Sequence, residues 1–364
     1  MKIICLIRHL KMGGAERQLS GLAITLHQLG HDVQVLTYHE GDFFDGILAA
    51  HGVPHVIVPK GGLTAVSIIR LSRYFKREKP DLVIAFAAGA GRKACLARML
   101  GGPFRLWVSE RNANPRKMPF DAYRMWLYGL AADRIICNSH SQEAFLRAHF
   151  PRRAGQLCTV VNFIDTQAFL PPALPPENPV FTVVTTARVC ARKNVLGFIE
   201  AVRRLQAEGR TLRVYWYGRN RDSRYLRRCE KAIREHGLEA CFFLRPSQRD
   251  VTALYGSADA FCLPSFYEGT SNSLAEALCC GLPVLCSDVS DNARYVRPGE
   301  SGFLFDPHDP ASLAQALRQA MDLTPSARYQ LGRQGRAIVL EALSPERFRD
   351  SYDALLREDF SAGC

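Results

Sequence analysis

The chain has 364 residues, which is enough for two domains of ordinary size, each with its own core. Apolar residues make up 47% and charged residues 23%, as in globular proteins that fold in water, and no run of about 18 uncharged apolar residues predicts a transmembrane helix. The formal net charge of +12 calls for an anionic partner, and since no nucleic-acid-binding signature accompanies it, we expect a phosphorylated substrate or an anionic membrane surface, and no nucleic acid.

The N-terminus and the cysteines bear on location. Arg8, His9 and Lys11 interrupt the apolar run of MKIICLIRHLKMGG, and no small-residue cleavage pattern follows, so we expect no signal peptide. The twelve cysteines are scattered, without C-x-x-C, and most lie in apolar runs, which favours reduced core thiols over disulfides or zinc. We therefore expect a cytoplasmic protein, which can also act at the inner face of the cytoplasmic membrane.

The chain opens with a predicted strand at Lys2–Ile7, a turn containing Gly13 and Gly14, and a helix with apolar residues on one face. A nicotinamide-binding domain would need G-x-G-x-x-G at this turn, and the glycines here do not fit. Paired glycines still allow the backbone to approach a ligand closely.

Further strands alternate with helical stretches through the first half of the chain, which predicts a parallel sheet with helices on both faces and ligands at the strand C-termini. The strands are expected at Val33–Thr37, His55–Val58, Leu82–Phe86, Arg105–Val108, Arg134–Cys137 and Leu157–Val161. The tetrapeptide Ser109-Glu110-Arg111-Asn112 falls at such a strand end.

Two stretches of the first half mix basic and aromatic residues, namely Ile68–Arg77 and Arg116–Trp126. Such faces can lie on an anionic bilayer. The alternative is an amphipathic helix packed on a sheet, with its charged side in water.

Five prolines between Pro171 and Pro179 exclude helix and sheet interior alike and predict an inter-domain linker. The second half then repeats the strand and helix alternation. Its strands are expected at Val180–Thr186, Leu212–Tyr217, Cys241–Leu244, Asp259–Leu263, Pro283–Cys286 and Gly302–Phe305. Ser344 followed by Pro345 predicts the start of a last helix that runs to about Arg357.

Cations follow the first strand of this half, at Arg188, Arg192 and Lys193. Cations at the end of a strand indicate an anionic ligand, although a basic surface loop is the alternative. Of the three, Arg192 is the one expected to be solvated.

The stretch Pro264–Asp288 carries the strongest signal. Two carboxylates, Glu268 and Glu276, flank a Gly-Thr-Ser-Asn-Ser loop that runs into an apolar helix, and Ser273 with Glu276 has the spacing of a capping box. Amides at a helix start attract anions, and carboxylates accept hydrogen bonds from hydroxyl groups, so the combination indicates a nucleotide sugar. The alternatives are that Glu276 only caps its helix and that Glu268 is a solvated loop charge.

The string from Glu268 to Leu285 resembles the glutamate-seven-residues-glutamate signature of the retaining GT-B glycosyltransferases of group 1, family 4, with its small-Gly-Leu-Pro-Val-Leu ending. GGAER after the first strand and Asn162-Phe163-Ile164-Asp165 also resemble family patterns, the latter with Phe163 in place of glycine. Where many members have a histidine, this chain has SERN, which resembles a subgroup that builds bacterial surface polysaccharides. That departure leaves two roles open for Glu110, which either positions an acceptor hydroxyl or pairs with Arg111 or another basic residue.

The resemblance implies an α/β GT-B fold with two Rossmann-like domains facing a central cleft. Residues 1–168 would form the acceptor-binding domain and residues 169–346 the nucleotide-sugar-binding domain, with a C-terminal helix at 347–364 crossing back to the first.

The resemblance also implies roles for individual residues. The catalytic residues would be Arg188 and Lys193, which grip the donor diphosphate, and Glu268, which lies beside the donor sugar. Donor binding would involve Gly13, Gly14, Gly218, Gly269, Thr270, Ser271, Asn272, Ser273 and Glu276, the last at the ribose, and the acceptor side would involve Glu110, Arg111 and Asn112. No cofactor is implied, and because the chain has no Asp-x-Asp motif we expect no catalytic metal.

Three functions therefore compete. The first is a metal-independent retaining glycosyltransferase of hexosyl type that moves a sugar from a nucleotide diphosphate, preferentially UDP, to a lipid-linked or saccharide acceptor in cell-envelope polysaccharide or glycoconjugate synthesis. The second is a GT-B-type sugar-nucleotide epimerase, which the two glutamates at this spacing do not support. The third is a non-catalytic scaffold protein that binds sugar nucleotides.

Overall fold

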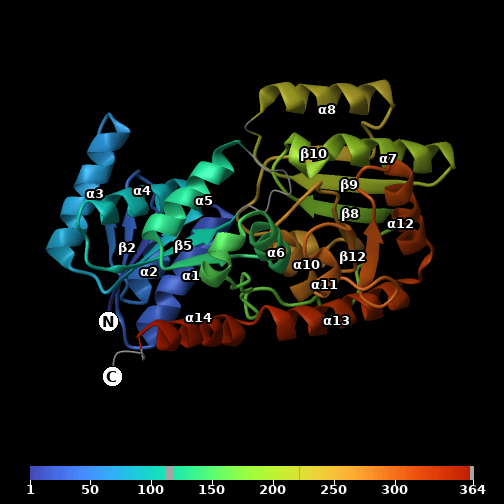
Figure 1. The fold of residues 1–364 in the computed structure, drawn as a ribbon. Helices are drawn as coiled ribbons and strands as arrows, with labels where there is room; N and C mark the ends of the chain where they lie inside the picture. The colour runs from blue at the N-terminus through green and yellow to red at the C-terminus, as the bar shows by residue number, and fades with distance from the viewer. Residues whose placement is uncertain (112–118, 221, 361–364) are drawn as a thin grey trace. The chain divides into compact units, whose positions relative to one another are not determined.

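Two parallel sheets form the framework of the protein in a computed structural model that describes residues 1–111, 119–220 and 222–360. The chain divides into two units, the first made of Met1–Asn162 and Phe348–Cys364 and the second of Phe163–Arg347. Each has one sheet with helices around it, as Figure 1 shows by colour along the chain. The first unit is therefore completed by the end of the chain.

The first unit has a seven-stranded sheet of strand order β3-β2-β1-β4-β5-β6-β7, with every strand pair parallel. Its elements are β1 (Lys2–Ile7), α1 (Gly14–Gln28), β2 (Asp32–Thr37), α2 (Asp45–Ala50), β3 (His55–Ile57), α3 (Thr64–Glu78), β4 (Leu82–Phe86), α4 (Ala87–Met99), β5 (Arg105–Glu110), α5 (Pro119–Ala131), β6 (Arg134–Cys137), α6 (His140–His149), a 3₁₀ helix (Pro151–Gln156) and β7 (Leu157–Thr159).

The second unit has a six-stranded parallel sheet of order β10-β9-β8-β11-β12-β13. Its elements are β8 (Phe181–Thr186), a 3₁₀ turn (Ala191–Lys193), α7 (Val195–Ala207), β9 (Leu212–Tyr217), α8 (Ser223–Glu235), β10 (Phe242–Arg245), α9 (Thr252–Gly256), β11 (Ala260–Leu263), α10 (Asn272–Cys279), β12 (Val284–Ser287), α11 (Asn292–Tyr295), β13 (Gly302–Phe305), α12 (Pro310–Asp322) and α13 (Pro325–Ala342). The last helix, α14 (Pro345–Phe360), belongs to the first unit from Phe348 onward.

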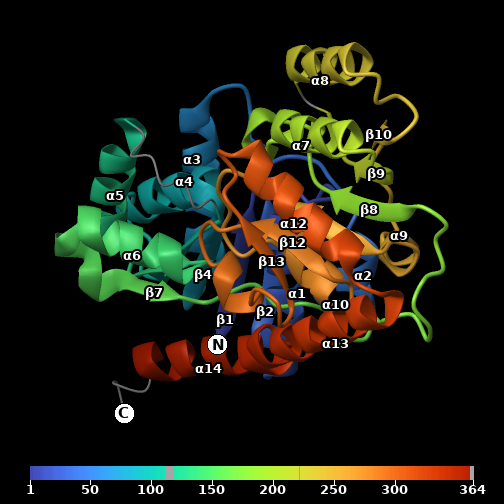
Figure 2. The same cartoon turned by 90° about the vertical axis from the view of Figure 1, so that its right-hand side faces the viewer.

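Hydrophobic runs explain why these strands lie in the middle of their sheets. Strands β1, β4, β11 and β12 are almost wholly buried, as expected for parallel strands covered on both faces. In the second unit α7 and α12 pack together over the sheet, and α10 packs against α13, as Figures 1 and 2 show. All thirteen predicted strands are present, with ends that differ by at most two residues.

One strand end differs in a way that matters for the site. Strand β5 continues through Ser109 to Glu110, so these two residues belong to the sheet and not to the loop after it. Ser109 and Glu110 pair with β6 in register, opposite Ile136 and Cys137. The side chain of Glu110 is consequently buried.

The proline-rich segment lies within the second unit. Pro172, Pro175 and Pro176 line a small pocket together with Tyr255 and Cys280. Just before the prolines, the carbonyl of Phe169 accepts a hydrogen bond of 2.9 Å from Arg336 Nη1. The segment is thus packed within the second unit, which begins before it at Phe163.

Helix α14 begins at Pro345 as predicted, and the amide of Arg347 donates to Ser344 Oγ at 3.2 Å. Further along, Tyr352 is buried and stacks with Trp107 of β5, with ring centroids 6.5 Å apart. Asp359 accepts hydrogen bonds from Trp107 Nε1 and Arg134. These contacts bind the end of the chain to the first sheet.

Among the helices of the described ranges, none combines the length and the apolar character that crossing a membrane requires. The eleven cysteines in those ranges are free thiols, and most are buried.

Candidate functional site

The side chains expected at the donor site of the second unit gather at the C-terminal edge of its sheet. From β8 the chain runs outward through β9 and β10 and then returns to the other side of β8 as β11. The loops after β8 and β11 therefore diverge, which is where open parallel sheets bind ligands. Lys193 follows β8 and Glu268 follows β11.

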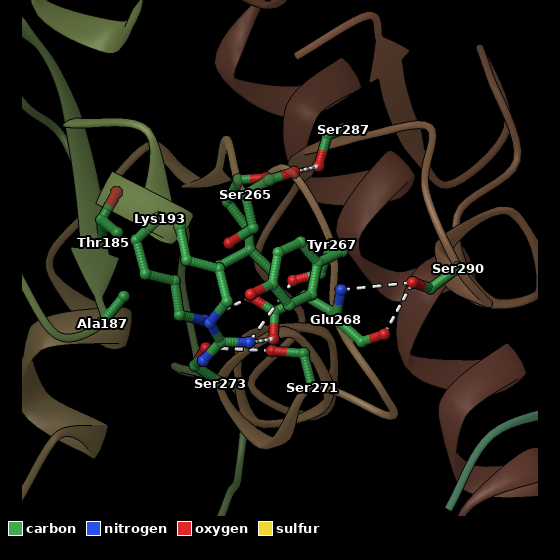
Figure 3. Close-up of polar contacts among 12 residues, drawn as sticks. Thr185, Ala187, Lys193, Ser265, Tyr267, Glu268, Ser271, Ser273, Ser287 and Ser290 are labelled. Atoms are coloured by element: carbon green, nitrogen blue, oxygen red, sulfur yellow. Dashed lines mark hydrogen bonds and ion pairs between the residues drawn. The ribbon is translucent and has the colours of Figure 1, made fainter. Parts of the chain in front are cut away.

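Lys193 and Glu268 form a buried ion pair, the shortest contact between them joining Nζ to Oε1. Figure 3 shows the two side chains pointing toward each other. They are only 7% and 5% exposed. Arg192 adds a longer contact, with Nη1 3.4 Å from Glu268 Oε2. Arg192 is thus not the purely solvated cation expected from the sequence, because it also lies over the Tyr267 ring.

The electrostatics of this pair follow from burial and charge. Burial alone would raise the pKa of Glu268, but Lys193 and Arg192 outweigh it and hold the pKa of the carboxyl below its usual value. For Lys193 burial is the largest influence and lowers the pKa of the ammonium, although Glu268 counteracts it. Glu268 is therefore a carboxylate at neutral pH.

Hydrogen bonds to the backbone fix Glu268 and the loops around it. Ser290 Oγ donates to the carbonyl of Glu268 at 2.6 Å. The backbone amide of Glu268 in turn lies 3.2 Å from Ser290 Oγ. Ser287 Oγ donates to the carbonyl of Ser265 at 2.6 Å (Figure 3). Thr185 Oγ1 donates to the carbonyl of Cys262 at 2.7 Å. These hydrogen bonds join the loops at this edge of the sheet to one another and to the neighbouring strands.

Lys193 is held by the start of α7. Asn194 adopts a left-handed conformation with φ of 57° and caps that helix, its side chain accepting from the amide of Gly197. The side-chain Nδ2 of Asn194 donates to the carbonyl of Pro307 at 2.8 Å. Asparagine tolerates this conformation better than most residues, and the sharp turn directs the preceding Lys193 toward Glu268.

Glu276 is buried in α10 and accepts a hydrogen bond of 3.0 Å from the hydroxyl of Tyr255. Tyr255 in turn lies 2.5 Å from Thr186 Oγ1 at the end of β8. Burial and the charge of Glu276 raise the pKa of Tyr255 well above its usual value, so the hydroxyl remains a donor.

The capping box predicted for Ser273 and Glu276 is wrong. Helix α10 begins at Asn272, and Ser271 is its N-cap residue, without a side-chain capping bond. Glu276 lies beyond the third helical position, where a capping glutamate would reach back to the N-cap amide. Its carboxylate is directed to Tyr255.

The loop from Gly269 to Ser273 joins Glu268 to Glu276. Thr270 and Ser271 are buried, and the hydroxyls of Ser271 and Ser273 lie 3.3 Å apart. Gly269, Asn272 and Ser273 are only partly buried. The loop thus combines fixed hydroxyls with partly accessible groups at the start of an α-helix.

Gly218, directly after β9, is required by close packing. A Cβ at this position would lie 1.8 Å from the carbonyl oxygen of Ala187. That carbonyl accepts a hydrogen bond from Trp216 Nε1 at 2.8 Å and so cannot move freely.

Arg188 directly follows Ala187, is exposed, and makes no ion pair with any described residue. Arg188 is therefore available to an anionic ligand.

In the first unit, Gly13 is the N-cap residue and Gly14 the first residue of α1. A Cβ on Gly13 would lie 2.2 Å from Glu16 Oε2, so this glycine makes room for the Glu16 carboxylate. Glu16 Oε1 lies 3.2 Å from His9 Nδ1. Gly13 and Gly14 belong to the first unit, whereas the other donor-site residues belong to the second.

Glu110 is 2% exposed and accepts a hydrogen bond of 2.8 Å from Tyr128. Arg124 lies 3.5 Å from the same carboxylate and 2.8 Å from Asp121. The basic partner of Glu110 is thus Arg124. Arg111 is directed elsewhere: it donates to Asn162 Oδ1 at 2.8 Å and lies over the Phe86 ring. Asn112 falls outside the described residues.

Sequence reasoning missed Tyr255 and Ser290, which hold the two glutamates, and Thr186, which contacts the Tyr255 hydroxyl. Tyr255 lies in the short helix α9, and neither its position there nor the apolar residues around it indicated that its hydroxyl meets Glu276. Ser290 lies in a loop 22 residues from Glu268.

Among the described residues, no three His, Cys, Asp or Glu side chains are grouped to hold a metal ion.

Both sheets are parallel and reverse their strand order beside the first strand of the unit, and the second carries a buried Lys–Glu pair at its edge. This architecture is that of a Rossmann-like α/β protein of the GT-B class. The structure of a glycosyltransferase from Rickettsia africae superposes on 98% of the chain with a TM-score of 0.83 and 15% identity. That of Anabaena Alr3699/HepE in complex with UDP and glucose superposes on 98% of this chain and 100% of its own, with a TM-score of 0.84 and 18% identity.

Models of glycosyltransferase families match both units of the chain. Residues 180–322 match the glycosyl transferases group 1, and residues 12–168 match glycosyltransferase family 4. The chain therefore belongs to the GT-B glycosyltransferases of this group.

Two curated relatives share 31% and 24% of their aligned residues with this chain. The chain is 24% identical over 334 residues to the GalNAc-alpha-(1->4)-GalNAc-alpha-(1->3)-diNAcBac-PP-undecaprenol alpha-1,4-N-acetyl-D-galactosaminyltransferase of Campylobacter jejuni, covering 88% of this chain and 89% of that protein. It is 31% identical over 133 residues to the O-antigen chain mannosyltransferase B of Escherichia coli. That match spans 36% of this chain and about a third of the relative, 34% of its length.

Proposed function

We propose that this protein is a retaining glycosyltransferase that moves a hexosyl group from a UDP-sugar to a lipid-linked or saccharide acceptor in the synthesis of a cell-envelope polysaccharide or glycoconjugate. The observation that carries the proposal is the buried Lys193–Glu268 pair beside the exposed Arg188, on the same sheet edge as Glu276. A structural ion pair alone would not need a free arginine and a second buried carboxylate next to it.

The cations would act on the leaving group. As the glycosidic bond to a diphosphate breaks, negative charge grows on the departing oxygen, and preorganised positive groups stabilise that charge. Arg188 is free to meet the diphosphate, and Lys193 would share its charge between Glu268 and the phosphate. In this proposal the cations take the place of a divalent metal.

The two glutamates would then bind different parts of the donor. Glu268, fixed by Ser290 and kept ionised by Lys193, would accept hydrogen bonds from hydroxyls of the donor sugar. Glu276 would accept hydrogen bonds from the ribose, with Tyr255 orienting its carboxylate. Retention would follow from attack on the face of the leaving group, where the departing phosphate takes the acceptor proton.

The choice of donor and acceptor rests on the similar proteins. The superposed Anabaena structure is a complex with UDP and glucose, which favours a UDP-sugar as the donor of this chain. The Campylobacter jejuni relative is named for a saccharide on undecaprenyl diphosphate, and the Escherichia coli relative for the O-antigen chain. Both names favour a growing, lipid-linked glycan as the acceptor of this chain.

We also propose that the first unit contacts an anionic membrane. Helix α5 exposes Tyr123, Trp126 and Leu130, each about half exposed, at the spacing of one helix face. The rings of Tyr123 and Trp126 stack with centroids 6.0 Å apart. Helix α3 adds the exposed Ile69 and a basic side formed by Arg70, Arg73, Lys76 and Arg77. Exposed aromatic and basic groups together are typical of surfaces that bind anionic bilayers.

Co-sedimentation with vesicles of anionic lipid tests this contact. We expect salt-sensitive binding that the double substitution Trp126→Ser, Leu130→Ser reduces. Leu174→Ser is a matched control, because Leu174 is 77% exposed but belongs to the second unit. No sedimentation at low salt would refute the membrane contact and leave the donor site untouched.

A thermal-shift screen against nucleotide sugars tests the proposed donor. A ligand at about 100 times its dissociation constant stabilises the folded state by about 2.7 kcal/mol, so UDP-sugars should raise the Tm more than ADP- or GDP-sugars. The absence of a shift with every nucleotide sugar would contradict the proposal. A protein that binds the donor but never releases nucleotide on addition of an acceptor would be the scaffold, and one that changes the donor sugar would be the epimerase.

A further inference from the structure

A second basic cluster lies in the first unit, on residues that the donor site does not use. Arg8 follows β1, His39 follows β2 and Lys60 follows β3, while Arg92 and Lys93 lie in α4. The amide of His39 donates to the carbonyl of Arg8 at 3.0 Å, and that of Lys60 to the carbonyl of Tyr38 at 3.1 Å. The three loops are thus joined at the C-terminal edge of the sheet, beside the switch point between β1 and β4.

Lys93 is the unusual member of this cluster. Its Nζ is inaccessible to solvent and has no hydrogen-bond partner among the described residues. The ammonium lies 5.0 Å from the centroid of the Tyr38 ring, a cation–π contact that offsets only part of the cost of burying it. Buried polar groups in proteins are nearly always paired, so an ammonium left without an acceptor indicates a missing anionic ligand.

The charges around Lys93 and His39 are positive. After burial, Lys60 and Arg92 contribute most to lowering the pKa of Lys93. The pKa of His39 is lowered by burial and then by Arg8, Lys60, His9 and Lys93. The nearby carboxylate of Glu16 is directed to His9. Several cations without matching anions suit a ligand of more than one negative charge, and lysine is well suited to phosphate as a point charge.

We propose that Arg8, His39, Lys60, Arg92 and Lys93 form a binding site for a phosphate or diphosphate group carried by the acceptor. This assignment rests on the proposed glycosyltransferase function, and it adds that the acceptor is recognised through its phosphate as well as its sugar. A single carboxylate, as in a uronic acid, would leave most of these cations unpaired. The phosphate would accept the hydrogen bonds that Lys93 cannot make to the protein.

Calorimetric titration with inorganic pyrophosphate, in the presence of saturating UDP, tests the site separately from the donor site. We expect wild-type protein to bind about one pyrophosphate under these conditions. Lys93→Gln should weaken that binding at least tenfold, Lys93→Arg should retain most of it, and Lys60→Gln should weaken it as an independent variant. Lys231→Gln is the control for loss of one charge, since Lys231 lies exposed on α8 in the second unit; it should leave the affinity unchanged.

Stability gives a second readout. Because Lys93 has no partner among the described residues, Lys93→Gln should keep or raise the Tm of the ligand-free protein. A clear fall in that Tm would assign Lys93 a structural role and overturn the proposal. So would the loss of all pyrophosphate binding when UDP is present, or equal affinities for the wild type, Lys93→Gln and Lys60→Gln.

The outcomes separate this site from the proposed function. If UDP fails to bind while pyrophosphate still binds through Lys93, the donor assignment fails and the phosphate site stands. If UDP binds and pyrophosphate does not, the donor site stands and the acceptor phosphate is refuted. A phosphate-bearing acceptor should also show a KM raised at least tenfold in Lys93→Gln, with the Kd of UDP unchanged.

Discussion

The two units use the same sheet architecture but treat buried charge differently. At the edge of the second sheet Lys193 is neutralised by Glu268, and Glu276 is held by the hydroxyl of Tyr255. At the corresponding edge of the first sheet Lys93 has no hydrogen-bond partner among the described residues, and its strongest charged neighbours are cations. Similar sheets can thus carry either a site whose charges are already neutralised or a set of charges that a ligand must complete.

The first unit also contains a paired carboxylate, on residues other than the five of the basic cluster. Glu110 is held by Tyr128 and Arg124 and is nearly inaccessible to solvent. Such a group stabilises the fold in the absence of substrate, whereas unpaired cations raise the free energy of the empty site and favour binding of an anion. Substitution of a paired buried charge should therefore lower the stability of the fold. Substitution of an unpaired cation should instead weaken anion binding without lowering stability.

Lys193→Ala should have the largest effect. Loss of one preorganised charge at the leaving group costs about 3 to 4 kcal/mol of transition-state stabilisation. The rate of nucleotide release should therefore fall about a hundredfold to a thousandfold, whereas the affinity for the donor should fall by a smaller factor. The same change leaves Glu268 buried without its main partner and should destabilise the fold by about 3 to 5 kcal/mol.

The double variant Lys193→Gln, Glu268→Gln separates these two effects. It removes both charges, and stability measured by urea unfolding should recover because neutral polar groups of similar size replace a buried ion pair. Turnover should remain low, since the charge for the leaving group is still missing. Recovery of turnover would remove Lys193 from the mechanism.

Glu276→Gln should weaken UDP binding by about 1.5 to 3 kcal/mol, because a charged acceptor for ribose hydroxyls becomes neutral. Calorimetry measures this loss. Tyr255→Phe is the companion variant, which leaves the carboxylate but removes the hydroxyl that orients it, and its effect should be smaller. An unchanged Kd in Glu276→Gln would show that this glutamate has only a structural role.

Gly218→Ala should destabilise the second unit by about 1 to 3 kcal/mol, because the added Cβ would lie 1.8 Å from a carbonyl oxygen that Trp216 holds in place. The displaced Ala187–Arg188 turn should also lower the affinity for UDP. Gly256→Ala is a matched control in the same unit, since a Cβ there meets nothing within 4 Å. Equal effects of the two substitutions in urea unfolding would contradict this explanation.

Tyr128→Phe should have the smallest effect, about 1 kcal/mol of lost stability, because Glu110 loses one hydrogen bond but keeps Arg124. Affinity for UDP should not change, since Tyr128 donates to Glu110, which is not among the residues expected to bind the donor. A change in the Kd of UDP, measured by calorimetry, would show that Glu110 supports the donor site and would weaken the contrast between the units.

Much of the fold could be predicted because its strands carry a strong local signal. Runs such as KIICLI and LVIAF are apolar throughout most of their length, and apolar runs separated by amphipathic stretches lead directly to parallel strands and helices. Strand order and the pairing of Glu110 with Arg124 depend on tertiary contacts, which spacing along the chain does not encode.

The candidate site was predictable in its residue types but not in its contacts. Lys193 and Glu268 were both expected at the donor site, yet their direct pairing joins positions 75 residues apart. The capping role of Glu276 failed because the helix begins at Asn272, before Ser273. Lys93 gave no signal at all, since a lysine in a helical stretch normally faces solvent, and only the fold shows its ammonium over Tyr38.

Release of nucleotide from the UDP-sugar that best stabilises the protein, followed in EDTA with a lipid-linked, phosphate-bearing saccharide, tests the central claim most directly. We expect one UDP released for each glycosidic bond formed, with activity retained in EDTA and with the anomeric configuration of the donor kept in the product. No acceptor-dependent release, release only after a divalent metal is restored, or a product of inverted configuration would contradict it.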